Sequence, residues 1–401
     1  MERYSEYKDS GVKWLGEIPS HWETLPGFAI FKENKEKNSD LRINTVLSLS
    51  YGKIIQKKDL NEGLVPAEYN TYQIVRPGNI IIRCTDLQND KTSLRTGFVK
   101  NEGIITGAYL GLIVNKKYNS SYIHYFLHAW DITKEIYRYG SGLRQSLSWV
   151  DLKRLSILIP SYDEQNAIVS YLDSVTSKID EAIAQQQKMI DLLNERKQII
   201  INDAVTKGLD PKAKMKDSGI DWIGQIPEHW EIRKASRCVE ISNGSDPKTD
   251  GDVPVYGSGS NSFRTCGEYK EGPCVLIGRK GATLHIPHYI EGRYWNVDTA
   301  FDVKTKCNDV LLKFYYLLAT QFDYKYYMFQ TTLPSMTSFD YNRMKLPIPP
   351  LQEQEKIIEY IKHSTNSIDS AIKSAENLIF LLQERKQIII NDVVTGKVKV
   401  T

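Results

Sequence analysis

The chain has 401 residues, of which 41% are hydrophobic and 25% charged, a globular composition with room for two or three domains. It has no run of about eighteen uninterrupted apolar residues and no apolar signal-peptide core, which argues against a membrane span or secretion and predicts a cytoplasmic protein. The net charge of +3 says little alone, and five cysteines without C-x-x-C spacing indicate reduced, mostly structural thiols.

The chain begins with a leader segment that recurs later. Residues 8–23 read KDSGVKWLGEIPSHWE and residues 216–231 read KDSGIDWIGQIPEHWE, with 11 of 16 positions identical. A second pair of segments, 192–207 and 381–396, is identical at 13 of 16 positions. The two copies of the leader are 208 residues apart, and the two copies of the trailing segment are 189 residues apart. The difference in length therefore lies in the stretch between leader and trailing segment. The plan is a fixed leader, a variable block and a fixed trailing segment, used twice.

The two variable blocks have the pattern of α+β domains. Short β-branched segments, broken by Gly and Pro, predict strands, and longer amphipathic segments predict helices. In the first block we expect strands at 45–51, 79–83, 104–108 and 111–114 and a helix at 122–131. In the second block we expect strands at 253–256, 274–277 and 299–303 and a helix at 310–322.

Positive charge collects in these blocks. Residues 24–158 hold 19 Lys and Arg against 12 Asp and Glu, and residues 232–347 hold 15 against 12. The stretch between them, 163–209, holds 5 against 8. Two separate basic blocks are expected if each meets phosphates, although random surface variation explains the smaller excess equally well.

Each block is followed by a long heptad segment. Apolar or small residues recur at alternating steps of three and four, which is the coiled-coil signature. Residues 163–207 would form a helix of roughly 67 Å, and such a length needs a partner. The natural partner is the second copy, running antiparallel, with an approximate two-fold axis relating the repeats; pairing with another subunit is the alternative. The first row is Ile168, Leu172, Val175, Ile179, Ala182, Met189, Leu193 and Ile200, and the second is Ile357, Ile361, Ile368, Ala371, Ala375, Leu378, Leu382 and Ile389.

These segments together resemble the specificity subunits of type I restriction-modification systems. The repeated motifs are W-x-G-x-I-P-x-H-W at 14–22 and 222–230, P-x-x-x-E-Q at 160–165 and 349–354, and the L-x-E-R-K-Q-x-I-I segment. Inside the blocks, PGNI, DLQND and LRQ resemble one group of target-recognition domains, and VYGSG with LIGRKG resembles another. The resemblance covers essentially the whole chain.

The resemblance implies a fold and a function. The fold would be two α+β target-recognition domains separated by two long antiparallel coiled-coil helices. The boundaries would be 1–158, 159–209, 210–347 and 348–401. Each recognition domain would read one half of a bipartite, asymmetric DNA target in host defence. The helices would set the gap between the halves and dock two methyltransferase subunits, with motor-nuclease subunits joining for restriction. S-adenosylmethionine is expected in the methyltransferase partners, and ATP and Mg in the restriction subunits.

The sequence contains no motif that indicates a catalytic role for the chain itself. An adenine methyltransferase should carry an N-P-P-Y/F-like turn, and the sequence has none; a P-loop is also missing. His124 and His128 have i, i+4 spacing without the H-E-x-x-H glutamate, and His285 and His288 lack a third ligand, so helix packing is the better interpretation. We therefore predict no catalytic and no metal-binding residues. Two alternatives are a self-contained methyltransferase and a coiled-coil scaffold without DNA specificity.

Polar and basic positions in the blocks are the candidates for DNA contact. Arg can pair with guanine, and Gln or Asn with adenine, whereas Lys more often holds phosphate; a solvated surface charge is the alternative for each residue. In the first block the candidates are Lys53, Lys57, Lys58, Arg83, Gln88, Asn89, Lys91, Arg95, Arg138, Arg144 and Gln145. In the second block they are Ser242, Asn243, Lys248, Ser258, Asn261, Arg264, Arg279, Lys280 and Arg293.

The repeated tryptophans are candidates for a different role. Trp14, Trp22, Trp222 and Trp230 could stack on bases, but their repetition beside the fixed helices favours packing or docking of partner subunits. Arg196 and Arg385, at equivalent places in the two L-x-E-R-K-Q segments, are further candidates for partner binding.

Overall fold

The computed structural model describes residues 2–57, 69–142, 145–259, 261–328 and 334–400. The chain divides into two compact units, which we call unit 1 (Met1–Gln185 and Asn377–Thr401) and unit 2 (Gln186–Glu376). Each unit contains one leader, one block and part of both long helices. Within the described residues, no helix combines the length and the apolar character needed to cross a bilayer.

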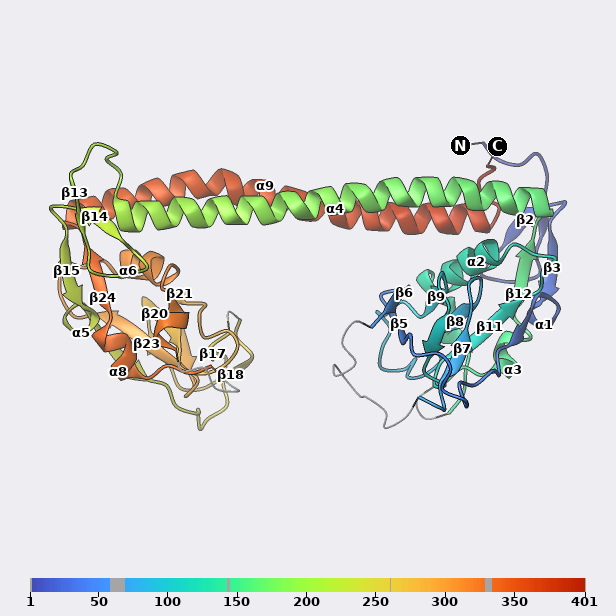
Figure 1. The fold of residues 1–401 in the computed structure, drawn as a ribbon, viewed down its shortest axis with the longest axis horizontal. Coiled ribbons are helices and arrows are strands. Elements are labelled where there is room, and N and C mark those ends of the chain that lie inside the picture. The colour runs from blue at the N-terminus through green and yellow to red at the C-terminus, as the bar shows by residue number, and fades with distance from the viewer. Residues whose placement is uncertain (1, 58–68, 143–144, 260, 329–333, 401) are drawn as a thin grey trace. The chain divides into compact units, whose positions relative to one another are not determined.

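Unit 1 is built on a four-stranded antiparallel sheet of order β4-β11-β8-β9. Helix α2 packs against β9 of this sheet, and the β5–β6 hairpin and the β10–β7 pair add to it (Figure 1). The strands are β1 (Tyr7–Asp9), β2 (Glu17–Pro19), β3 (Glu23–Pro26), β4 (Phe31–Glu33), β5 (Leu47–Ser50), β6 (Lys53–Gln56), β7 (Gln73–Val75), β8 (Ile80–Ile82), β9 (Thr96–Phe98), β10 (Gly103–Ile105), β11 (Leu110–Val114) and β12 (Ser156–Ile159). The helices are α1 (Gly27–Ile30), α2 (Ser120–Ile132), η1 (Glu135–Arg138) and α3 (Trp149–Leu152).

Unit 2 repeats the sheet with the order β16-β23-β20-β21 and adds a second sheet, β18-β17-β22-β19. The strands are β13 (Met215–Asp217), β14 (Gln225–Pro227), β15 (Glu231–Lys234), β16 (Val239–Asn243), β17 (Val253–Tyr256), β18 (Arg264–Cys266), β19 (Lys270–Glu271), β20 (Cys274–Gly278), β21 (His288–Ile290), β22 (Arg293–Asn296), β23 (Ala300–Thr305) and β24 (Lys345–Ile348). The helices are α5 (Ala235–Cys238), α6 (Leu312–Ala319), α7 (Tyr324–Tyr327) and α8 (Ser338–Arg343).

The long helices are α4 (Tyr162–Lys207) and α9 (Leu351–Val394). In unit 1, Ile168 of α4 shares a core with Val393 of α9, and Asp180 pairs with Lys386. Partner numbers fall along α9 as they rise along α4, so the helices run antiparallel there. Unit 2 shows the same order, with Lys197 paired to Asp369 and Val205 in one core with Ile357. The heptad pattern therefore predicted correctly that the two long helices pair with each other within the chain. The alternative was that each helix pairs with another subunit.

A pair of flanking strands closes each block. In unit 1, β3 at the end of the leader pairs with β12 just before α4. In unit 2, β15 pairs with β24 just before α9 in the same way. The chain thus enters and leaves each variable block through two paired antiparallel strands. The residues of the block can therefore differ without displacing the leader or the long helix.

The core of each unit joins leader, block and helices. In unit 1, Trp22 of the leader, Phe126 of α2 and Leu172 of α4 belong to one buried cluster. In unit 2, the equivalent cluster contains Trp230 and Phe314. The nine strands and helices predicted inside the blocks all form, with end shifts of a few residues. The five cysteines are free thiols, four of them buried, and burial raises the pKa of Cys84 to about 12.

Candidate nucleic-acid interface

The two blocks share one scaffold, which the sequence did not reveal. The third and fourth strands of each main sheet are joined by a loop, Arg83–Arg95 between β8 and β9 and Arg279–Pro287 between β20 and β21. A later segment of the chain hydrogen-bonds to the start of each loop. Leu147 N donates to Cys84 O in unit 1, and Met336 N donates to Arg279 O in unit 2. We call these the first and second recognition loops.

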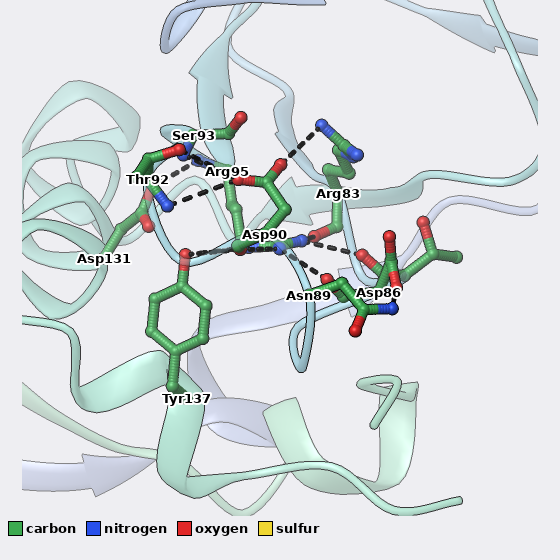
Figure 2. Close-up of polar contacts among 10 residues, drawn as sticks. Arg83, Asp86, Asn89, Asp90, Thr92, Ser93, Arg95, Asp131 and Tyr137 are labelled. Atoms are coloured by element: carbon green, nitrogen blue, oxygen red, sulfur yellow. Dashed lines mark hydrogen bonds and ion pairs between the residues drawn. The ribbon is translucent and has the colours of Figure 1, made fainter. Parts of the chain in front are cut away.

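The first recognition loop presents three of the candidate residues to solvent. Gln88, Asn89 and Lys91 are exposed, and the Asn89 amide donates to Asp86 Oδ1 at 2.8 Å (Figure 2). Arg83 is partly buried, and its guanidinium lies 3.2 Å from Asp90 Oδ2. An exposed amide beside a cation is a pair of groups that can read a base edge and hold a phosphate.

Arg95 is a correction to the predicted DNA-contact set. Its side chain is fully buried, and its guanidinium donates to oxygens of the protein rather than facing solvent. A polar segment looks the same in sequence whether its arginine points outward or inward. Arg95 therefore cannot contact DNA in this structure.

Gln145 has a role within the fold that the sequence did not predict. Its side-chain amide donates to the backbone oxygens of Tyr137 and Tyr139 at 2.7 and 2.9 Å, so both amide hydrogens serve the fold. Its own backbone oxygen accepts from Leu87 N of the first recognition loop. Gln145 thus supports the first recognition loop, and its contact with DNA stays a prediction.

The remaining candidates of the first block lie elsewhere on unit 1. Lys53 is exposed on β6, 3.8 Å from Asp180 Oδ2, and Lys57 is half-buried just after that strand. Arg138 is exposed on η1 and pairs with Glu135 at 3.1 Å. Lys58 and Arg144 lie outside the described residues.

The second recognition loop carries a basic pair. Arg279 is exposed, and Lys280 pairs with Asp298 at 2.8 Å. Ser258 meets this loop through its hydroxyl, 3.3 Å from Thr283 Oγ1. The structure therefore places Ser258 beside the loop that carries Arg279 and Lys280, which the sequence did not predict.

Other candidates of the second block are exposed but dispersed. Arg264 pairs with Asp246 at 2.7 Å, and Arg293 stacks on the Tyr269 ring at 4.5 Å. Exposed residues at the end of β16 and in the loops around β17 complete the set: Ser242, Asn243, Lys248 and Asn261.

Two of the four tryptophans are not available to a partner, which corrects their assignment to partner binding. Trp22 and Trp230 are fully buried, and each indole donates to the glutamate of a P-x-x-x-E-Q motif, Glu164 or Glu353, at 3.1 Å. The packing alternative holds for both. Trp14 and Trp222 are partly buried, and Trp14 packs against Phe126.

The glutamine of the same motif ties each block to its long helix. Gln165 accepts from Asn119 N, the residue before α2, and donates to Pro160 O. Gln354 accepts from Leu311 N, the residue before α6, and donates to Pro349 O. The repeated motif is thus structural: its glutamate holds the leader and its glutamine holds the block.

Each long helix also carries an exposed apolar row, which we call the helix stripe. On α4 it consists of Met189, Leu192 and Ile199, with relative exposures of 42, 55 and 53%. Met189 and its counterpart Leu378 were predicted in the heptad rows that pair the helices, and their exposure corrects that prediction. The equivalent row on α9 is Leu378, Leu381 and Ile388, at 41, 48 and 52%. Arg196 and Arg385 are exposed and continue these rows at heptad spacing. Exposed leucine and isoleucine thus recur at equivalent places on the two long helices.

The buried titratable groups behave as packing residues. Burial lowers the pKa of His124 to about 3 and that of His128 to about 4, so both rings are neutral near pH 7. His128 Nδ1 lies 3.1 Å from Thr96 Oγ1, and the two imidazoles stack at 5.9 Å. Among the described residues, no group of three or more His, Cys, Asp or Glu side chains is arranged to hold a metal ion.

Comparison with known proteins identifies relatives along the whole chain. Residues 227–377 match the sequence model of the type I restriction modification DNA specificity domain. Two similar proteins of Methanocaldococcus jannaschii are the putative type I restriction enzyme MjaX specificity subunit, 24% identical over 98% of both chains, and the type I restriction enzyme MjaVIII specificity subunit, 23% identical over 98% of this chain and 97% of the relative.

The fold also has a counterpart among solved structures. A chain described under complex assembly and conformational transition of the type I R-M system aligns with a TM-score of 0.68. The alignment covers 95% of this chain and 99% of that one, at 14% sequence identity. At that identity the likeness is one of fold.

Proposed function

We propose that the chain is a specificity subunit of a type I restriction-modification system, and that it recognises a bipartite, asymmetric DNA target without catalysing a reaction itself. The observation that carries the proposal is one scaffold with two different interiors. Both blocks have the same four-strand order and a recognition loop at the same place, yet Gln88 and Asn89 stand in one loop and Arg279 in the other. Different side chains on equal scaffolds would read different half-sites.

Chemistry supports DNA as the ligand of both loops. Exposed Gln and Asn amides suit the N6 and N7 groups of adenine, and an exposed Arg suits O6 and N7 of guanine. The first block carries an excess of 7 positive charges and the second an excess of 3, from 19 minus 12 and 15 minus 12. Such an excess favours approach to phosphates and fixes the protein on the duplex before bases are read.

The two helix stripes support docking of two methyltransferase subunits. Because the stripes are equivalent, two copies of one partner can bind them through the same contacts. Leu192 on α4 and Leu381 on α9 would be covered, with Arg196 and Arg385 beside them. Partner subunits would bring S-adenosylmethionine, and restriction subunits would bring ATP and Mg, so the chain would work where the host DNA is, in the cytoplasm.

A self-contained methyltransferase is the alternative in another class. The sequence lacks the N-P-P-Y/F-like turn that positions the target amine, so methyl transfer by this chain alone is not expected. A scaffold without DNA specificity is the other alternative. It offers no reason for unlike, exposed polar loops on a repeated scaffold.

One experiment separates the three functions. The purified full chain, alone and with its methyltransferase partner, is incubated with a randomised duplex library and with labelled S-adenosylmethionine. Selection of two separated half-sites, with methyl transfer only when the partner is present, supports the proposal. Methyl transfer by the chain alone would establish the enzyme alternative, and binding without sequence preference would establish the scaffold.

Arg279→Ala sharpens this test. Loss of a base contact should lower specific binding by about 1–3 kcal/mol while leaving non-specific binding nearly unchanged. Lys345→Ala, which removes an exposed charge from the flanking strand β24, is the matched control. An equal fall in specific and non-specific binding for Arg279→Ala would make it a phosphate contact, and no fall would make it a surface charge.

A further inference from the structure

A buried cation lies under the first recognition loop. The side chain of Arg95 is inaccessible to solvent, although it carries a full positive charge. Its five N–H groups all have acceptors within the protein: Nε donates to Tyr137 Oη, Nη1 to Arg83 O and Thr85 O, and Nη2 to Asp86 O and Asp90 O (Figure 2). Burial of a charge is tolerated only when it is fully hydrogen-bonded in this way.

Four of those acceptors belong to the loop itself, and this determines the loop's shape. The carbonyls of Arg83, Thr85, Asp86 and Asp90 all turn inward onto one guanidinium. Asp86 adopts the left-handed region with φ 63°, which is uncommon for a non-glycine residue although aspartate is among those that adopt it most often. One side chain therefore holds four carbonyls of the loop in place.

Other contacts fasten the same loop at its ends. Asp90 Oδ1 accepts from the backbone N–H groups of Thr92 and Ser93 at 3.3 and 3.0 Å. Asp131 Oδ2, on α2, accepts from Arg95 N and from Thr96 N. Tyr137 Oη also donates to Asp90 O at 3.1 Å. The loop is thus attached to η1 and α2 as well as to its own strands.

Because the loop carbonyls point inward, the side chains at the tip of the loop face solvent. Gln88, Asn89 and Lys91 are exposed, while Leu87 between them and the core is fully buried. Base readout needs such groups in a fixed arrangement, because ordering them on contact would weaken binding.

We propose that Arg95 is a positioning residue for DNA specificity, which holds the first recognition loop in one shape so that Gln88, Asn89 and Lys91 meet the duplex together. The inference rests on the proposed function, since it supposes that this loop meets DNA. Lysine cannot replace Arg95, because an ammonium has three donors and no planar fork to bridge four carbonyls.

Two variants of the full chain test this role, with a closely matched control. Arg95→Lys keeps the charge and removes the fork, and Tyr137→Phe removes one hydroxyl that joins Arg95 to Asp90 O. Tyr122→Phe removes a hydroxyl that donates to Leu158 O at 2.9 Å in the same unit, away from the loop. Each is bound, with the methyltransferase partner, to a randomised duplex library, and amide exchange is measured across residues 86–93.

Both loop variants should relax base preference in the half-site of the first block, by about ten-fold for Arg95→Lys and less for Tyr137→Phe. The preference in the other half-site should persist, amide exchange should rise in the loop, and Tyr122→Phe should match the unaltered chain. Unchanged base preference in folded Tyr137→Phe together with faster loop exchange would overturn the positioning role, as would equal relaxation by Tyr122→Phe. If Arg95→Lys does not fold, Tyr137→Phe alone decides.

Failure of the proposed function gives a different result. Gln88→Ala and Asn89→Ala leave the Arg95 contacts in place and should alter the same half-site. If the unaltered chain selects no sequence at all, the proposed function fails. If it selects a sequence that neither alanine variant changes, the function stands and the inference about this loop is wrong.

Discussion

Lys386 Nζ lies 2.6 Å from Asp180 Oδ1, which joins the C-terminal part of α9 to the N-terminal part of α4 within unit 1. The repeat makes the same contact in unit 2, where Lys197 Nζ lies 2.6 Å from Asp369 Oδ1. Lys386 and Asp369 are the counterparts of Lys197 and Asp180, each displaced by 189 residues. One interhelical contact thus occurs twice with its two helices exchanged, as an internal two-fold repeat requires.

Because both pairs are partly exposed, we expect them to fix helix register more than stability. A double-mutant cycle with Asp180→Asn and Lys386→Gln should give a coupling of about 0.2–1 kcal/mol in urea unfolding, decreasing with added salt. The cycle with Asp369→Asn and Lys197→Gln should give a similar value. A coupling well above this range, or one insensitive to salt, would contradict the assignment of these pairs as screened surface contacts.

Removing Glu164 should cost more than removing a surface charge. Glu164→Ala leaves the buried indole N–H of Trp22 without its acceptor, and the hydroxyl of Tyr4, 2.7 Å from Glu164 Oε1, also loses its partner. We expect a loss of about 1–3 kcal/mol in the free energy of unfolding of unit 1. Glu164→Gln keeps a side-chain oxygen and should lose less.

The equivalent change in unit 2 is the internal control for this prediction. Glu353→Ala likewise removes the acceptor of the buried Trp230 indole, which donates to Glu353 at 3.1 Å. Denaturant unfolding with amide exchange near each leader measures both. Equal stability of Glu164→Ala and the unaltered chain would show that the repeated tryptophan–glutamate contact does not hold the leader.

The sequence predicted the parts of the molecule that are encoded by repetition and period. The heptads predicted a helix at 163–207, which forms as α4, and a second long helix within 348–401, which forms as α9 over residues 351–394. The β-branched runs predicted the two inner strands of each main sheet, β8 and β11 or β20 and β23, but not the outer strands β4, β9, β16 and β21. The Trp22–Glu164 contact joins residues 142 apart, and only the recurrence of both motifs hinted at it. The inward orientation of the Arg95 side chain could not be predicted from the sequence, because backbone carbonyls that point into a loop do not require particular residue types. Exposed candidates such as Gln88 stay predictions until DNA contact is measured.

Acid should weaken unit 1 through two buried histidines. Burial lowers the pKa values of His124 and His128 in the folded state below the usual 6.5, so the unfolded chain binds more protons between about pH 6.5 and 4. Stability is therefore complete above pH 6.5 and falls as the pH drops, by about 1–2 kcal/mol per histidine at pH 5. Asp90, whose pKa is lowered mainly by hydrogen bonds from Ser93, adds nothing in this range because it stays ionised.

Urea unfolding at constant ionic strength, between pH 7 and pH 5, measures this effect. His128→Gln should reduce the slope of stability against pH by about half, because one of the two protonations is removed. Amide exchange in α2 should locate the loss in unit 1. A flat stability profile, or a slope unchanged by His128→Gln, would contradict the role of these histidines.

Exchange of a single block should change one half of the DNA target and keep the other. The strand pairs that close the blocks define where to cut. Gly27 N donates to Leu155 O at the end of the β3–β12 pair, and Ala235 N donates to Met344 O at the end of the β15–β24 pair. Replacing residues 27–155 with the block of a relative keeps β3, β12 and both long helices. The incoming block must supply a helix N-terminus whose backbone N–H reaches Gln165, as Asn119 does here.

The expected product retains the half-site of the second block, because the second recognition loop and its core lie wholly within unit 2. The half-site of the first block should become that of the donor. Mapping of methylated adenines in cells that express the chimera and its methyltransferase partner reads both halves at once. The reciprocal exchange of residues 235–344 is the control and should reverse which half changes. A simultaneous change in both halves would show that the blocks do not read DNA independently, and retention of both would place recognition outside the exchanged blocks.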